Sequence, residues 1–169
     1  MTNSTHNKFV QIEVSKYPAI KREKRKLVQS HYFGAINLRK IGRTLTAEEK
    51  SVLGLYQNQH ITTAMIDLVE PGMESLFDID EALRLITHNA RQKYQIYKAW
   101  QELITQPNVI AIEFSHPNDK LTCKHCSLLN DKPLKKKFKL LQHLENYCSC
   151  IWFRGELNPH LAKKMSNQG

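Results

Sequence analysis

The sequence has no long apolar run. No stretch of the 169-residue chain approaches the roughly 18 consecutive apolar residues of a membrane span. No apolar stretch follows the polar residues 1–8 either, so we expect no secretory signal, a cytoplasmic location and no membrane partner. Because the cytoplasm is reducing, the few cysteines, four in all, are better interpreted as metal ligands than as disulfides.

Sequence signatures of catalysis are also lacking. The chain contains no P-loop, no His-Glu-x-x-His, no Gly-x-Ser-x-Gly and no dinucleotide fingerprint. His143-Leu144-Glu145 is similar to the His-x-Glu of zinc deaminases, but there the paired cysteines follow as Pro-Cys-x-x-Cys, and here Cys-x-x-Cys comes first. We therefore expect no enzyme activity and no small-molecule substrate.

Positive charge is concentrated at the two ends of a chain whose net charge is +9. Residues 1–45 carry 10 basic and 2 acidic side chains, and residues 120–169 carry 10 and 3. Residues 46–119 carry 5 basic and 11 acidic side chains. Two basic ends suit a polyanion or an acidic partner, although charged side chains also serve simply to keep a surface solvated.

The apolar pattern predicts an α+β fold that is mostly helical, with a helical core, short strands and a C-terminal zinc knuckle or ribbon-like module. We expect strands at 9–14, 109–114 and 151–153, one or two short helices after the basic run 21–26, and helices at 46–68 and 79–104. The predicted regions are a basic N-terminal segment of strand plus helix (1–45), a helical core (46–108), a zinc-binding module (109–155) and a basic tail (156–169).

All four cysteines fall within 28 residues, as Cys123-x-x-Cys126 and, after 21 residues, Cys148-x-Cys150. Each pair can turn both sulfurs toward one metal. Two pairs brought together by the intervening loop give a tetrahedral set of four thiolates, which suits Zn²⁺. Such a set leaves no open coordination position, so the spacing predicts a structural site.

Other interpretations of the cysteines stay open. Cys-x-x-Cys is also a dithiol redox motif, but no βαβ pattern precedes it and the second pair would have no role. Four inert thiols are the plainest alternative. A soft four-sulfur site also holds iron, and His125 or His143 could replace one cysteine as a ligand.

Around the cysteines the chain resembles the C-terminal motif of the phage Mu F-like minor head proteins, a head-morphogenesis family of tailed phages. The resemblance extends over residues 79–154. It is carried by an apolar strand ending near Phe114, then by Asp119, Leu121–Cys126, Leu128–Leu134 and Cys148–Cys150. The chain departs from the motif at Asn130 or Asp131 (glycine), Glu145 (histidine) and Ser149 (arginine).

What the resemblance implies is a zinc-stabilised, phage-type accessory or structural protein related to head morphogenesis, associated with the virion. Its basic surfaces would bind virion components or nucleic acid. The residues that we expect to contact nucleic acid are Lys135, Lys136, Lys137 and Lys139, which flank Phe138, together with Lys21, Arg22, Lys24, Arg25 and Lys26.

Two further functions fit the same residues. The first is a small zinc-containing regulator that binds nucleic acid through these lysines and arginines. The second is a protein-binding adaptor or inhibitor that engages a host protein through the acidic middle or the basic ends. For the lysine run itself, a solvated loop is the alternative to a binding surface.

Overall fold

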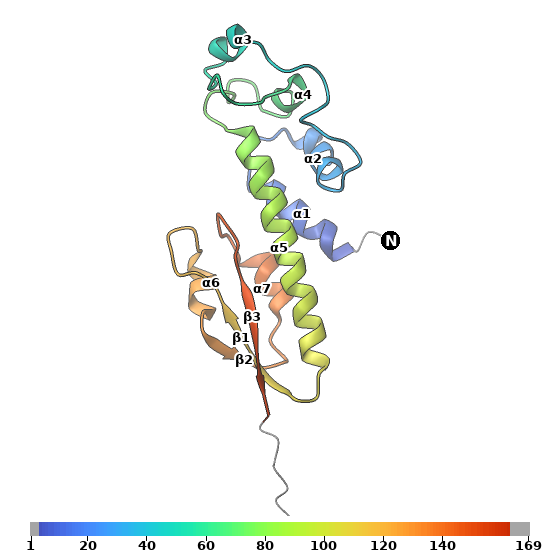
Figure 1. Cartoon of the computed structure of the whole chain (residues 1–169), viewed down its shortest axis with the longest axis vertical. Coiled ribbons are helices and arrows are strands. Elements are labelled where there is room, and N and C mark those ends of the chain that lie inside the picture. The colour runs from blue at the N-terminus through green and yellow to red at the C-terminus, as the bar shows by residue number, and fades with distance from the viewer. Residues whose placement is uncertain (1–3, 163–169) are drawn as a thin grey trace, which may run out of the picture. The chain divides into compact units, whose positions relative to one another are not determined.

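The computed structural model describes residues 4–162. The fold is α+β and mostly helical, which confirms the predicted class (Figure 1). The chain divides into two compact units, the N-terminal unit (Met1–Ala90) and the C-terminal unit (Arg91–Gly169). Within the described residues, no helix has the length and apolar character that a membrane crossing requires.

Short helices joined by turns build the N-terminal unit. In chain order they are α1 (Ser4–Ser15), the 3₁₀ turn η1 (Arg22–Lys24), α2 (Arg25–Tyr32), α3 (Ala47–Val52), α4 (Thr63–Ile66) and the first turns of α5 (Ile79–Thr105). Isolated bridges pair Ile20 with Val69 and Thr44 with Thr62, so loops that are distant in sequence lie together.

The strand predicted at residues 9–14 is wrong, because this segment belongs to α1. Its buried residues are Phe9, Val10, Glu13 and Val14. Phe9 and Glu13 are four apart, and so are Val10 and Val14, which places all four on one face of a helix. The alternation of Val10, Ile12 and Val14 is typical of a strand, but the buried residues follow the period of a helix.

The predicted helix 46–68 is also wrong in length. Its start is confirmed, since Thr46 and Glu49 form the reciprocal hydrogen bonds of a capping box. The helix then ends at Val52, and Gly54 adopts a φ of +68° just beyond it. A new helix, α4, begins only after Thr62, whose side chain accepts a hydrogen bond from the backbone of Met65.

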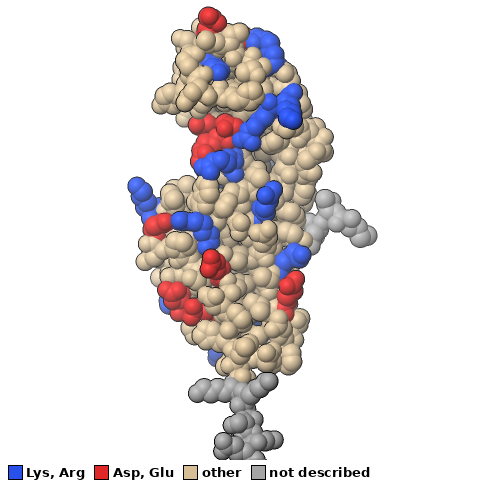
Figure 2. Space-filling view, in the orientation of Figure 1, with Lys and Arg blue, Asp and Glu red and all other residues tan. Residues whose placement is uncertain are grey.

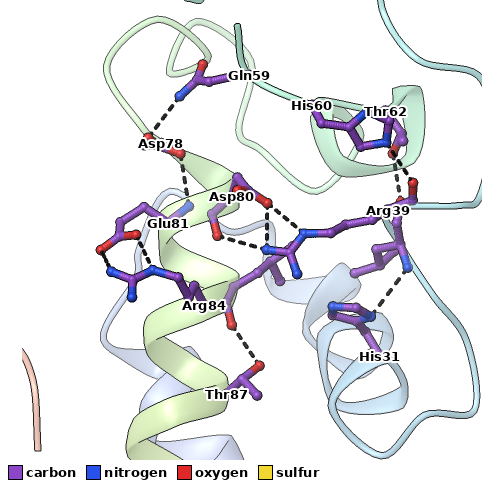
Figure 3. Close-up of polar contacts among 12 residues, drawn as sticks. His31, Arg39, Gln59, His60, Thr62, Asp78, Asp80, Glu81, Arg84 and Thr87 are labelled. Carbon is purple, nitrogen blue, oxygen red and sulfur yellow. Dashed lines mark hydrogen bonds and ion pairs between the residues drawn. The ribbon is translucent and has the colours of Figure 1, made fainter.

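Helix α5 runs from Ile79 to Thr105, close to its predicted bounds. Asp78 caps it by accepting a hydrogen bond from the Glu81 amide at 3.0 Å, and Gln59 donates to the same carboxylate (Figure 3). Arg39 forms an ion pair with Asp80 in the first turn at 2.6 Å. Gln59 and Arg39 therefore tie the preceding loops to the start of α5, where negative side chains are favoured.

The C-terminal unit combines the rest of α5 with a small sheet. Its elements are β1 (Val109–Ser115), α6 (Lys124–Leu129), β2 (Lys132–Leu134), α7 (Leu140–Asn146) and β3 (Glu156–Leu161). The sheet is antiparallel with the order β2-β1-β3, and β1 pairs Phe114 with Lys132 on one side and with Leu157 on the other. The buried apolar residues of the C-terminal unit include Trp100, Val109, Ile112, Phe114, Leu134, Leu140, Leu144 and Phe153.

The third strand does not lie where the sequence placed it. Residues 151–153 form no strand, and β3 instead occupies the first part of the predicted basic tail. Main-chain hydrogen bonds to β1 define this strand, and most of its side chains are exposed, so it has no apolar alternation to recognise. The rest of that tail, residues 163–169, lies outside the described residues.

Candidate metal centre

The four predicted ligands converge in the C-terminal unit. Cys123 immediately precedes α6 and Cys126 lies in its first turn, whereas Cys148 and Cys150 follow the end of α7. Their sulfur atoms all lie within 4.8 Å of one another. Bonds of about 2.3 Å from zinc to four sulfurs in a tetrahedron would hold those sulfurs ~3.8 Å apart. The cluster could therefore hold a metal ion with only small adjustments.

Backbone amides link the two cysteine pairs to each other. The Cys123 amide donates to the sulfur of Cys150 at 3.3 Å, and the Ser149 amide donates to the sulfur of Cys123 at 3.4 Å. A further backbone bond joins Ile151 to the Leu121 carbonyl. Donors that point at sulfur stabilise the thiolate form that a metal requires.

Asp119 connects the segments before and after the cluster. Its carboxylate accepts a hydrogen bond from the Leu121 amide at 3.0 Å and forms an ion pair with Arg154 at 2.5 Å. The Arg154 guanidinium holds the pKa of this carboxyl below its usual range. Asp119 thus ties the segment before Cys123 to the segment after Cys150. Its carboxylate belongs to no metal-ligand group among the described residues.

Two buried histidines contact the cluster, one from helix α7 and one from the loop after β1. His143 of α7 places Nε2 3.7 Å from the sulfur of Cys126, and His116 places Nε2 3.7 Å from that of Cys150. Because the Arg154 amide donates to Nε2 of His116, this nitrogen is an acceptor. Burial lowers the pKa of His143 to about 4, with the nearby charges of His125 and Lys93 acting in the same direction.

These contacts bear on the question of a histidine ligand. Among the described residues, the group of mutually close ligand atoms consists of the four cysteines. His143 borders that group, while His125 is exposed and its ring lies 5.5 Å from that of Tyr147. His116 was not among the predicted residues; the sequence offers only its place at the end of β1 as a signal.

A fully buried lysine approaches the cluster from α5. Lys93 is 0% exposed, and its ammonium donates to the carbonyl oxygens of Leu144 at 3.4 Å and Cys148 at 3.2 Å. The same ammonium lies 5.9 Å from the centre of the Phe153 ring. A buried positive charge favours a cluster that carries negative charge on its thiolates. Lys93 was not among the predicted residues, because in the sequence it is one polar position in a long helix.

The thiols alter one another's ionisation. Hydrogen bonds with Cys126 and Cys148 lower the pKa of Cys150, and those with Cys123 and Cys126 lower the pKa of Cys148. The hydrogen bonds with Cys148 in turn raise the pKa of both Cys123 and Cys126. A metal bound by all four sulfurs would displace the protons that they carry.

The residues predicted to bind nucleic acid fall into two separate groups. Lys135, Lys136, Lys137 and Lys139 lie in the turn between β2 and α7, in the C-terminal unit. The basic run 21–26 lies on η1 and α2 in the N-terminal unit, where Lys21 and Lys24 form ion pairs with Asp67. Figure 2 shows acidic side chains among the basic ones on the face in view.

Fold and site together define a two-unit α+β protein with a four-cysteine centre that can hold a metal ion. No family model matches the chain, and no curated protein or solved structure matches it either. The resemblance to the phage Mu F-like minor head proteins therefore rests on the cysteine motif and the residues around it.

Proposed function

We propose that this chain is a zinc-stabilised accessory or structural protein of the phage head-morphogenesis type. In this proposal the metal fixes the C-terminal unit as a rigid module that binds a virion component or nucleic acid. The observation that carries the proposal is the convergence of two sequence-distant cysteine pairs, with all four sulfurs within 4.8 Å.

Zinc is the metal that fits this donor set best. Four thiolates in a tetrahedron are the usual ligands of structural zinc, which has no redox chemistry and no preference for another geometry. Three of the cysteines are buried, and the fourth, Cys123, is only partly exposed. Four protein ligands leave no position for water or substrate, so a structural role is supported over a catalytic one.

The type of protein is supported by the cysteine frame and its surroundings. A strand leads through Asp119 to Cys-x-x-Cys, and a loop and short helix lead on to Cys-x-Cys, in the order that the resemblance implies. The basic turn 135–139 lies between the two pairs, on a segment that the metal would close at both ends.

Metal content tests the first half of the proposal. Elemental analysis of the purified chain should find one zinc per chain, and Cys126→Ser should lose it. Ser149→Ala, which changes the residue between the last two cysteines without removing a sulfur, is the matched control and should keep the metal. Full zinc content in Cys126→Ser, or a different metal in the unaltered chain, would contradict the assignment.

Incorporation into phage heads tests the second half. Heads and precursor particles assembled by the genome that encodes the chain should contain it, detected by mass spectrometry after gradient purification. The chain carrying Cys126→Ser should be present in smaller amounts, because its C-terminal unit would be unfolded. A chain that is expressed but absent from heads and precursors would refute the head-morphogenesis role while leaving the zinc centre standing.

A further inference from the structure

A groove of about 510 Å³ opens in the C-terminal unit beside the cysteine centre. Apolar and aromatic side chains, among them Leu134, Phe138 and Tyr147, form part of its lining, and His143 joins them from α7. Lys135, Lys137 and Lys139 also line it. The groove therefore combines an apolar surface with three positive charges from one short turn.

Aromatic rings form a row along this groove. The ring of Phe138 lies 6.1 Å from that of His143, which in turn lies 6.2 Å from that of Tyr147. His125 continues the row at 5.5 Å from Tyr147. The inner rings are largely covered, but Tyr147 is 49% exposed and His125 is exposed as well. The outer end of the row thus presents ring surface to solvent.

The lysines of the turn differ in their availability. Lys136 donates to the carbonyl of Gln106, which ties it to the end of α5. Lys135, Lys137 and Lys139 are exposed, and they form no ion pair with any of residues 4–162. Three unneutralised ammonium groups next to exposed rings suit a ligand with both phosphates and planar bases.

We propose that this groove binds single-stranded nucleic acid, with phosphates at Lys135, Lys137 and Lys139 and a base stacked on Tyr147. A duplex keeps its bases stacked on one another, so it cannot offer a free base to the ring. An acidic peptide would match the lysines but not the ring. This inference rests on the proposed zinc centre, because Tyr147 adjoins Cys148 and takes its position from it.

The test uses the zinc-loaded full chain and a fluorescein-labelled oligothymidylate of roughly 16 nucleotides, with anisotropy measured over a range of salt concentrations. Replacing Lys135, Lys137 and Lys139 by glutamine should weaken binding at least tenfold. It should also reduce the slope of log affinity against log salt by about 2. Tyr147→Leu should weaken binding by about tenfold while leaving the slope unchanged.

The matched control replaces three exposed lysines of the same unit that do not line the groove, Lys98, Lys120 and Lys132, by glutamine. It should bind nearly as the unaltered chain does. The inference would be overturned if the groove and control variants lost equal affinity for the oligonucleotide, or if Tyr147→Leu lost none. Binding of polyglutamate with the same affinity as the oligonucleotide would also overturn it. Zinc is measured in every sample. Bound zinc without oligonucleotide binding refutes only the groove, whereas absent zinc in the unaltered chain refutes the proposed function.

Discussion

Removing the proposed zinc ion should unfold the C-terminal unit and leave the N-terminal unit folded. Structural zinc contributes roughly 10–16 kcal/mol to the folding of small domains. That is as large as the whole stability of an ordinary domain, about 5–15 kcal/mol. Shared among four thiolates, it is about 3 kcal/mol for each, so Cys126→Ser should lower zinc affinity by at least about a hundredfold.

The positions of the tryptophans make this prediction easy to measure. Trp100 and Trp152 are the only two in the chain, and both belong to the C-terminal unit. Trp100 is 2% exposed, and its ring lies 6.1 Å from that of Phe138. Tryptophan fluorescence should therefore shift to longer wavelength when a chelator removes the metal, and it should return when zinc is added back.

Hydrogen exchange supplies the control for the N-terminal unit. The backbone amides of Ile20 and Val69 donate to neighbouring turns and lie at the bridge that joins two loops of that unit. Their protection should survive chelation, since no group of potential metal ligands is found there among the described residues. Unchanged tryptophan fluorescence in protein shown to be metal-free would refute the argument that zinc holds the C-terminal unit together.

Three other predictions concern single residues. Lys93→Met should weaken zinc retention against a chelator and destabilise the protein by roughly 3 kcal/mol in denaturant titration, because two buried carbonyls lose their donor. Gly42→Ala should lower the unfolding temperature more than Gly34→Ala; both have positive φ, but only at Gly42 would a Cβ collide with Thr63. Burial, with nearby carboxylates, raises the pKa of Tyr17 to about 12 from 10. The folded protein therefore holds the phenol proton more tightly than the unfolded chain does, so the contribution of Tyr17 to stability should be complete below pH 10 and be lost between pH 10 and 12. A phenolate absorbance titration should show one fewer late-ionising tyrosine in Tyr17→Phe.

Local signals predicted the elements whose cause is local. The capping box at Thr46 and Glu49 is confirmed, and so are α5 and β1, because capping residues, regular apolar spacing and β-branched runs act within a few residues. The same reasoning failed at residues 9–14. There the valines at positions 10 and 14 satisfy the spacing of a strand and of a helix equally, and packing within the N-terminal unit selected the helix.

At the candidate site, too, local features were predictable and contacts between distant segments were not. Cysteine spacing predicted the residues that converge, since two close pairs need only one loop closure to meet. The buried contacts from Lys93 and His116 could not be predicted, because each joins the cluster to a partner that is distant in sequence: Lys93 donates to the carbonyl of Cys148, and His116 contacts the sulfur of Cys150. Likewise β3 pairs with β1 through its main chain, and its exposed side chains carry no pattern.

The geometry also bears on the redox interpretation of Cys-x-x-Cys. A reactive dithiol needs an accessible cysteine with a lowered pKa at the start of a helix. Here the most accessible cysteine, Cys123, does precede α6, but its pKa is raised by the hydrogen bond with Cys148. The lowered pKa values belong to Cys148 and Cys150, which are buried. Because the four sulfur atoms lie within 4.8 Å of one another and three of the four cysteines are buried, the cluster suits four shared metal ligands better than one attacking thiol.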